Sequence, residues 1–133
     1  MNPLYHLVAM RARHRCEYCR APEVIFNLEF EVEHITPQSA GGTDHEANLA
    51  LACRSCNLLK SDRTTAIDPA TSAESRLFHP RHDDWSDHFF VEPATGQIGG
   101  LTSVGRATLE LLRMNGPLQI VARRQWIRLG LFP

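Results

Sequence analysis

Two Cys-x-x-Cys pairs constrain this chain more than any other feature of its sequence. Cys16 and Cys19 form the first pair, Cys53 and Cys56 form the second, and 33 residues separate the two pairs. Four thiolates spaced in this way can surround one tetrahedral Zn²⁺ ion, and an all-thiolate shell leaves the metal no open position for chemistry. A single pair would also fit a redox motif, but two pairs flanking one compact segment favour a structural zinc site.

The length of 133 residues predicts a single domain over 1–133, large enough to bury a hydrophobic core. No apolar run approaches 18 residues, and the N-terminal residues lack a charged segment followed by an apolar one. We therefore expect neither a membrane span nor a signal peptide. This places the chain in the cytoplasm, where cysteines are more often metal ligands or catalytic thiols than disulfides.

The net charge of −1 does not mark a strongly basic nucleic-acid binder. The charges are unevenly distributed, however. Several arginines precede the first cysteine pair, and several more enrich the last third of the chain: Arg11, Arg13, Arg15, Arg106, Arg113, Arg123, Arg124 and Arg128. A basic face is compatible with this pattern. The arginine-rich last helix is either a solvated face or a DNA-contacting surface, and the sequence leaves both readings open.

The first half of the chain predicts a helix, two strands and a second helix around the cysteine pairs. Apolar spacing favours a helix over 3–14, and alternation of apolar and acidic residues favours a strand over 25–35. Pro37 ends that strand, and a glycine pair marks a turn. A short strand over 49–52 and a helix over 53–62 then complete a β-β-α unit.

The second half predicts an irregular linker over 63–80, followed by a small hairpin and two helices. The hairpin joins 89–91 to 97–101 across a turn, and Thr102 or Ser103 caps a helix that runs to Asn115. The last helix spans 117–129, with Ile120, Val121 and Trp126 in the core. The fold class is therefore α+β.

Three polar positions between the cysteine pairs carry the candidate chemistry: the Glu33-His34 pair, Asn48 and Asn57. Phosphodiester hydrolysis needs an activated water and a cation that stabilises the charge developing on the leaving oxygen. A neutral imidazole such as that of His34 is well suited to remove a proton near pH 7. Adjacent residues of an ideal strand point to opposite faces, so Glu33 and His34 serve one site only if the strand bends or ends there.

This pattern, with Asn48 fourteen residues after His34 and Asn57 nine residues further on, resembles the HNH endonuclease family. The resemblance implies a zinc-stapled ββα-metal finger over about 16–63. It also implies an accessory region over about 84–133, because the segments at 85–89, 98–102 and 105–108 resemble stand-alone bacterial HNH proteins.

The resemblance implies a role for each polar residue. His34 matches the general base that activates water, and Asn48 matches the residue that braces the loop and orients that base. Glu33 and Asn57 match the ligands of one catalytic cation, and Lys60 matches a basic position facing phosphate. The position of Asn57 is often His in this family. A carboxylate with an amide oxygen is a hard-ligand set that suits Mg²⁺ or Mn²⁺, so we expect one such ion beside the structural Zn²⁺.

The expected function is metal-dependent cleavage of double-stranded DNA, with 5′-phosphate and 3′-hydroxyl ends as the resemblance implies. Two alternatives remain open: a catalytically silent zinc module that binds nucleic acid, and a protein-interaction domain on the same scaffold. A second group of polar residues is expected to be a solvated loop and not a metal site. Its members are His79, His82, Asp83, Asp84, Asp87 and His88. A surface role is expected for His45.

Overall fold

A computed structural model describes residues 2–133, which divide into two compact units. The first unit ends at Thr64 and the second comprises Thr65–Pro133. The expected ββα core at 16–63 falls inside the first unit, while the single domain over 1–133 stays a prediction. Among the described residues no helix is both long and apolar enough to cross a membrane.

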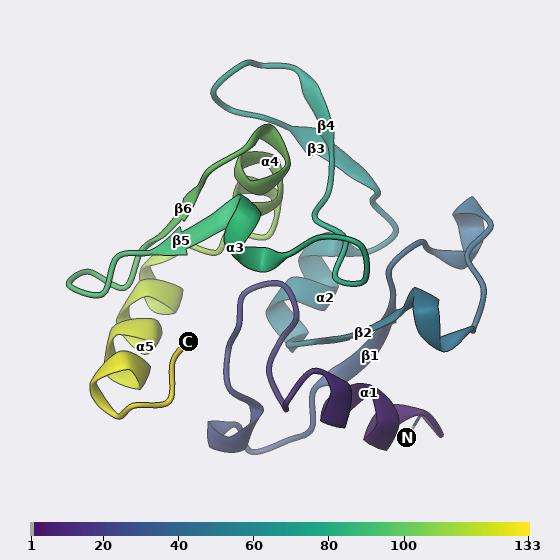
Figure 1. Cartoon of the computed structure of the whole chain (residues 1–133), viewed down its shortest axis with the longest axis horizontal. Coiled ribbons are helices and arrows are strands. Elements are labelled where there is room, and N and C mark those ends of the chain that lie inside the picture. Colours follow the sequence, from purple (N-terminus) through teal and green to yellow (C-terminus); the bar gives the residue numbers. More distant parts are fainter. Residues whose placement is uncertain (1) are drawn as a thin grey trace. The chain divides into compact units, whose positions relative to one another are not determined.

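The first unit is built on an antiparallel hairpin that two short helices contact (Figure 1). Its regular elements are α1 (Tyr5–Arg11), β1 (Glu31–His34), β2 (Leu49–Ala52) and α2 (Arg54–Lys60). In the hairpin Glu31 lies opposite Ala52 and His34 lies opposite Leu49. The predicted β-β-α order is therefore confirmed, within the α+β class.

The strand β1 is much shorter than the expected 25–35. Residues Glu23–Ile25 form a 3₁₀ turn instead, and Leu28 is 59% exposed. The carboxylate of Glu23 accepts a 2.6 Å hydrogen bond from the backbone N–H of Phe30, which fixes the chain just before pairing begins. Pairing is limited to four residues because β2 itself ends at Ala52, directly before the first residue of the second cysteine pair.

All four residues of β2 are buried, so its two faces are both covered. Helix α1 contacts β2 and contributes the fully buried Val8 and Ala9. Burying a leucine side chain such as Leu49 or Leu51 stabilises a fold by about 1.5–3 kcal/mol. The small side chains of Ala50 and Ala52 leave room for the helices against the hairpin, and this packing fixes the strand that pairs with β1.

The second unit contains two hairpins and three helices (Figure 1). Its elements are β3 (Thr65–Ile67), β4 (Glu74–Arg76), α3 (Trp85–His88), β5 (Phe89–Val91), β6 (Ile98–Gly100), α4 (Ser103–Leu111) and α5 (Pro117–Arg128). The predicted hairpin of 89–91 with 97–101 is confirmed as β5–β6. The predicted cap is also confirmed, because the Thr102 hydroxyl accepts a 3.0 Å hydrogen bond from the N–H of Gly105.

The prediction of an irregular linker over 63–80 is wrong, because β3 and β4 pair there as a hairpin. The side chain of Asp68 organises its turn by accepting hydrogen bonds from the N–H of Ala70 and the hydroxyl of Thr71. Both carboxylate oxygens also bind the guanidinium of Arg106, at 3.0 and 2.9 Å. Such bidentate pairs are among the stronger polar interactions in proteins, and this one ties the hairpin to α4.

The predicted core of α5 is wrong at Val121, which is 51% exposed. The buried residue of this helix is Arg123, at 1% exposure. Its guanidinium donates 2.7 Å hydrogen bonds to the carbonyl oxygens of Gly96 and Met114. Backbone acceptors at both terminal nitrogens offset the cost of burying the guanidinium, so Arg123 is a structural residue of the second unit.

Candidate active site and thiol cluster

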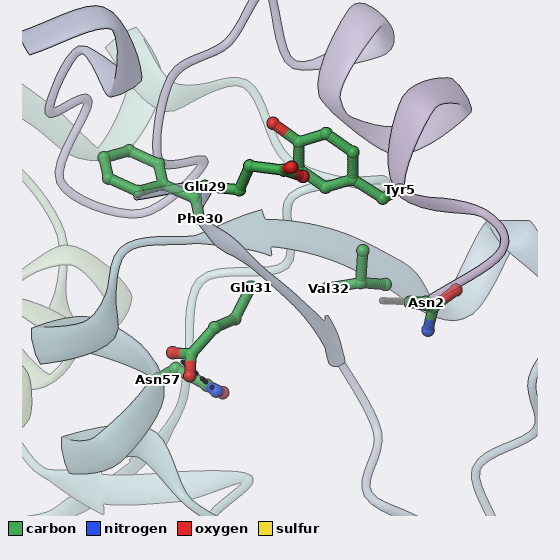
Figure 2. Close-up of a pocket in the computed structure, with 7 residues that line it drawn as sticks. All are labelled: Asn2, Tyr5, Glu29, Phe30, Glu31, Val32 and Asn57. Atoms are coloured by element: carbon green, nitrogen blue, oxygen red, sulfur yellow. Dashed lines mark hydrogen bonds between the residues drawn. The ribbon is translucent and has the colours of Figure 1, made fainter. Parts of the chain in front are cut away.

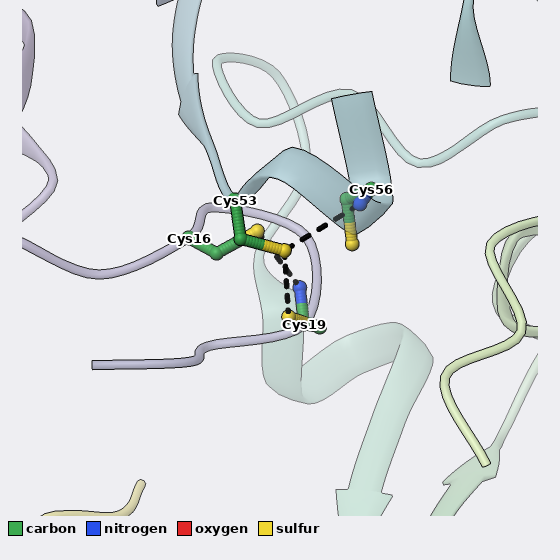
Figure 3. A group of neighbouring side chains, drawn as sticks. All are labelled: Cys16, Cys19, Cys53 and Cys56. Atoms are coloured by element: carbon green, nitrogen blue, oxygen red, sulfur yellow. Dashed lines mark hydrogen bonds between the residues drawn. The ribbon is translucent and has the colours of Figure 1, made fainter. Parts of the chain in front are cut away.

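The four cysteines converge on one buried point in the first unit (Figure 3). Their sulfur atoms all lie within 4.8 Å of one another, and the group could hold a metal ion such as zinc. Cys16 and Cys19 lie in the turn that follows α1. Cys53 is the N-terminal cap of α2, and Cys56 lies in the first turn of that helix.

Both cysteine pairs use the same local geometry. The backbone N–H of Cys19 donates to the sulfur of Cys16 at 3.5 Å, and the N–H of Cys56 donates to the sulfur of Cys53 at the same distance. In the first turn Arg20 has a φ of 67°, a left-handed conformation that closes the loop. N–H donors directed at sulfur favour the thiolate form that a metal ligand requires.

The electrostatics of the cluster also favour a bound cation. Hydrogen bonds from the other three thiols lower the pKa of Cys53. Hydrogen bonding within the cluster, together with burial, raises the pKa values of Cys19 and Cys56. Four buried thiols cannot all ionise side by side unless a positive ion compensates them. The donor set therefore fits a metal that binds four thiolates.

His34 ends β1 and its ring is paired with a carboxylate that the sequence analysis did not single out. Nε2 of His34 lies 2.7 Å from Oδ1 of Asp44, and Gln38 Nε2 donates to the same oxygen at 3.1 Å. The hydrogen bond from His34, aided by that from Gln38, lowers the pKa of Asp44. An ionised carboxylate only accepts, so Nε2 carries the proton when this bond forms.

Asn48 holds the loop that follows β1. Its Oδ1 accepts a 2.8 Å hydrogen bond from the N–H of Thr36, and its Nδ2 donates to the carbonyl oxygens of Thr36 and Thr43 at 2.9 and 2.8 Å. The backbone of Asn48 also accepts from the N–H of Ile35. Asn48 thus ties the segment after His34 to the segment before Asp44. Its function in orienting His34 stays a prediction.

Asn57 projects from α2 toward Glu31, a residue that the sequence analysis did not select (Figure 2). Nδ2 of Asn57 donates to Oε2 of Glu31 at 3.2 Å, and Arg54 contacts the other carboxylate oxygen at 3.1 Å. Strand alternation was the available signal, because Glu31 and Glu33 are two residues apart and share one face of β1. The side chain of Glu31 is 32% exposed and faces an open cavity of about 450 Å³.

Glu33 lies inside the unit and not at its surface. One carboxylate oxygen accepts a hydrogen bond from the hydroxyl of Tyr18, and the other lies 3.0 Å from Nζ of Lys60. Burial raises the pKa of Glu33, an effect that the Lys60 ammonium and the Tyr18 hydroxyl oppose. Both oxygens therefore already have a hydrogen-bonding partner, and Glu33 also lines a cavity beside His34.

Lys60 is also buried, at 2% exposure, although the sequence analysis expected it to face phosphate. Its Nζ donates to Glu33 and to the carbonyl oxygens of His34 and Ile35, at 3.0, 3.1 and 2.9 Å. An ammonium has three N–H donors, so all three are used. In this arrangement Lys60 has no donor left for a phosphate group.

A cavity of about 360 Å³ brings three of the expected residues together, since His34, Glu33 and Asn57 all line it. Gln38 and Asp62 belong to the same lining. Asn57 also lines the larger cavity with Glu31 and therefore borders both spaces. Polar oxygen atoms around a partly exposed imidazole can bind a hydrated cation and present a water to the base.

The second polar group, at 79–88, is more ordered than the expected solvated loop. Asp83 binds the guanidinium of Arg76 at 2.7 Å and the backbone N–H of His79 at 2.8 Å. Within the part of the chain that the structure describes, the cysteine group is the one cluster of three or more His, Cys, Asp or Glu side chains placed to hold a metal. His45 accepts from the N–H of Ala47 through Nδ1 and caps a short 3₁₀ turn.

Comparison with known proteins gives one match. Residues 16–63 match the family model described as HNH endonuclease. The match begins at the first cysteine of the thiol cluster and extends three residues past α2. No curated protein and no solved structure matches the chain.

Proposed function

We propose, from the match of residues 16–63 to the HNH endonuclease family model, that the protein hydrolyses phosphodiester bonds of DNA with the help of a divalent cation. HNH nuclease domains act on nucleic acids, and double-stranded DNA is the substrate we propose here. We place the activity in the cytoplasm. The products are fragments with 5′-phosphate and 3′-hydroxyl ends.

The observation that carries the proposal is the pairing of His34 with Asp44 beside the cavity that Asn57 also lines. Asp44 holds the protonated Nε2, which leaves Nδ1 as the nitrogen that takes a proton from water. The carboxylate also stabilises the imidazolium that results from that transfer. His34 is the general base, and Asp44 and Asn48 orient it.

The residues around Asn57 fit a hard divalent cation. Its Nδ2 faces Glu31, which leaves Oδ1 available as a ligand, and the adjacent carboxylate supplies a negative charge. Asn57 and Glu31 would hold the ion, which we propose to be Mg²⁺ or Mn²⁺. We do not include Glu33 among the ligands, because its two oxygens already accept hydrogen bonds from Tyr18 and Lys60. When bound, such an ion stabilises the charge that develops on the leaving oxygen.

The four thiols are proposed to hold one structural Zn²⁺ per chain. The observation that supports zinc is the compact all-sulfur donor set, which closes a tetrahedral shell. The role of this metal is to hold the turn after α1 against the start of α2, so it takes no part in the chemistry.

One observation favours the silent alternative, a zinc module that binds nucleic acid without cutting it. The carboxylate of Glu33, one of two ligands that the family resemblance implied for the cation, accepts hydrogen bonds from Tyr18 and Lys60.

Incubation of supercoiled plasmid with the purified protein distinguishes the nuclease from the silent module. Nicked or linear product in Mg²⁺, absent in chelator, supports the nuclease. Gel retardation without cleavage in any divalent ion supports the silent module.

A further inference from the structure

We propose that Tyr18, Glu33 and Lys60 form a buried positioning set that fixes the backbone of His34 and couples it to the thiol cluster. The three side chains come from three separate segments. Tyr18 lies between the first two cysteines, Glu33 lies on β1 and Lys60 is the last residue of α2. All three are almost fully buried, at 0%, 5% and 2% exposure.

Lys60 contacts the residues immediately before and after His34 in the chain, as well as the backbone of His34 itself. Besides Glu33, which precedes His34, its ammonium binds the carbonyl oxygens of His34 and Ile35. The next residue, Thr36, is held at its N–H and carbonyl by Asn48. Two side chains therefore fix three consecutive peptide units, and the direction in which the imidazole leaves the backbone is set by them.

The contact of Tyr18 links this arrangement to the cysteines. Its hydroxyl donates to the Glu33 oxygen that Lys60 does not bind. A buried carboxylate is costly unless each oxygen has a partner, so Tyr18 and Lys60 together hold Glu33 in place. Because Tyr18 lies between Cys16 and Cys19, a change in the geometry of the thiol cluster is passed by the Tyr18 side chain to Glu33, the residue before His34.

In this proposal Glu33 and Lys60 position His34 and do not bind the cation or the phosphate. The expected effect on cleavage rate rests on the proposed function, whereas the expected effect on the position of His34 does not. A group that positions a base changes the rate of the bound complex more than substrate affinity. A cation ligand would instead change the metal concentration needed for half-maximal rate. These two signatures are separable.

The test uses the full chain with two variants, Lys60→Met and Tyr18→Phe, and a matched control. Lys60→Met keeps the length of the side chain and removes its donors, and Tyr18→Phe removes one hydroxyl. Thr108→Val is the control, because it also removes one buried hydroxyl, which accepts a 2.9 Å hydrogen bond from the N–H of Phe78 in the second unit. Zinc content and thermal unfolding establish that each variant is folded.

Two readouts follow. The first is the set of ¹⁵N and ¹H resonances of the His34 ring in histidine-labelled protein, assigned by their loss in His34→Gln. The second is plasmid cleavage against DNA and Mg²⁺ concentration. In Lys60→Met and Tyr18→Phe we expect displaced His34 resonances and a kcat lower by about 10- to 100-fold, with KM and the half-maximal Mg²⁺ concentration within about twofold of wild type. Thr108→Val leaves both readouts unchanged.

Unchanged His34 resonances in a folded variant overturn the inference, and so does a rate loss that saturating Mg²⁺ restores. If Lys60→Met does not fold, Tyr18→Phe decides by the same criteria. If the wild-type protein cleaves no DNA, the proposed function fails while the ring resonances still decide whether the set positions His34.

Discussion

Nε2 of His34 lies 2.7 Å from Oδ1 of Asp44, although ten residues separate the two in the chain. The neighbouring acid, Glu33, has both carboxylate oxygens bound to other side chains. The carboxylate that we propose orients His34 therefore belongs to the loop residue Asp44, whose side chain is 80% exposed. We expect the loss of the Asp44 charge to lower the cleavage rate less than the loss of the His34 ring does.

His34→Ala is expected to lower cleavage by about 10²–10⁴-fold, which is what a general base typically contributes. Asp44→Asn removes the charge but keeps an acceptor for Nε2, so a smaller loss is expected, about tenfold. Initial rates on supercoiled plasmid measure both. Zinc content and DNA retardation should match wild type in each variant. Full activity in His34→Ala would falsify the assignment of the base.

The thiol cluster is expected to carry one zinc ion per purified chain, and Cys53→Ser is expected to cost folding before it costs catalysis. Bound zinc contributes about 10–16 kcal/mol in small zinc peptides, so little of the first unit should survive its loss. Metal analysis and circular dichroism check this, with Ser55→Ala in the same helix as a control. Folded protein with four reactive thiols and no metal contradicts the prediction.

Variants of Asn57 and its neighbours are expected to change the metal dependence of cleavage. Asn57→Ala removes an oxygen ligand and should raise the Mg²⁺ concentration for half-maximal rate. Asn57→His supplies an imidazole, which favours Ni²⁺, Co²⁺ or Zn²⁺. Cleavage is measured against metal concentration in buffer free of adventitious zinc.

Variants of Glu31 and Glu33, measured in the same experiment, show which of these two carboxylates binds the cation. Glu31→Gln should raise the half-maximal Mg²⁺ concentration as Asn57→Ala does, because Glu31 adjoins Asn57. Glu33→Gln should lower the saturated rate with little change in that concentration. The reverse outcome would identify Glu33 as the ligand.

The stability of the second unit is expected to depend on pH through Asp68. The bidentate hydrogen bonds from Arg106 lower the pKa of this carboxyl from 3.8 to about 2. A lowered carboxyl pKa means that its stabilisation is present above pH 3.8 and is lost as the pH falls through about 2. Wild type should therefore exceed Asp68→Asn in stability at pH 5, and this difference should shrink toward pH 2.

Urea unfolding followed by tryptophan fluorescence measures this difference. The chain has two tryptophans, Trp85 and Trp126, and both belong to the second unit. The signal therefore reports on that unit even if acid releases a metal from the thiol cluster. A difference between the two proteins that stays constant from pH 5 to pH 2 would contradict the assignment.

The sequence predicted the elements whose signals are local. The Cys-x-x-Cys spacing within each pair, the apolar strand at 49–52 and the cap at Thr102 each depend on residues a few positions apart, and each has a clear pattern. The hairpin β3–β4 has no such pattern, because its strands consist largely of polar residues. It depends on Asp68 meeting Arg106, 38 residues later, which no local window contains.

Within the candidate site, the sequence showed which types of residue are present, but it did not show which of them are buried or what they contact. A lysine and a glutamate near a catalytic histidine ordinarily indicate phosphate and metal contacts, yet Lys60 and Glu33 satisfy each other in the interior. Burial of this kind depends on acceptors that only the folded chain brings together. Arg123 is a parallel case, since the carbonyl oxygens that satisfy it come from two separate segments.

The position of Cys53 at the start of α2 has a consequence for the order of events during synthesis. A helix of seven residues is too short to persist alone in water. The first residue that stabilises it is also a member of the thiol cluster, so the helix forms together with that cluster. Asn57 and Lys60 are carried by α2, and a newly made chain therefore acquires both only when its thiols have gathered. If the thiols hold zinc and the protein is a nuclease, as proposed, a chain made without zinc would lack both residues in place and would cleave no DNA.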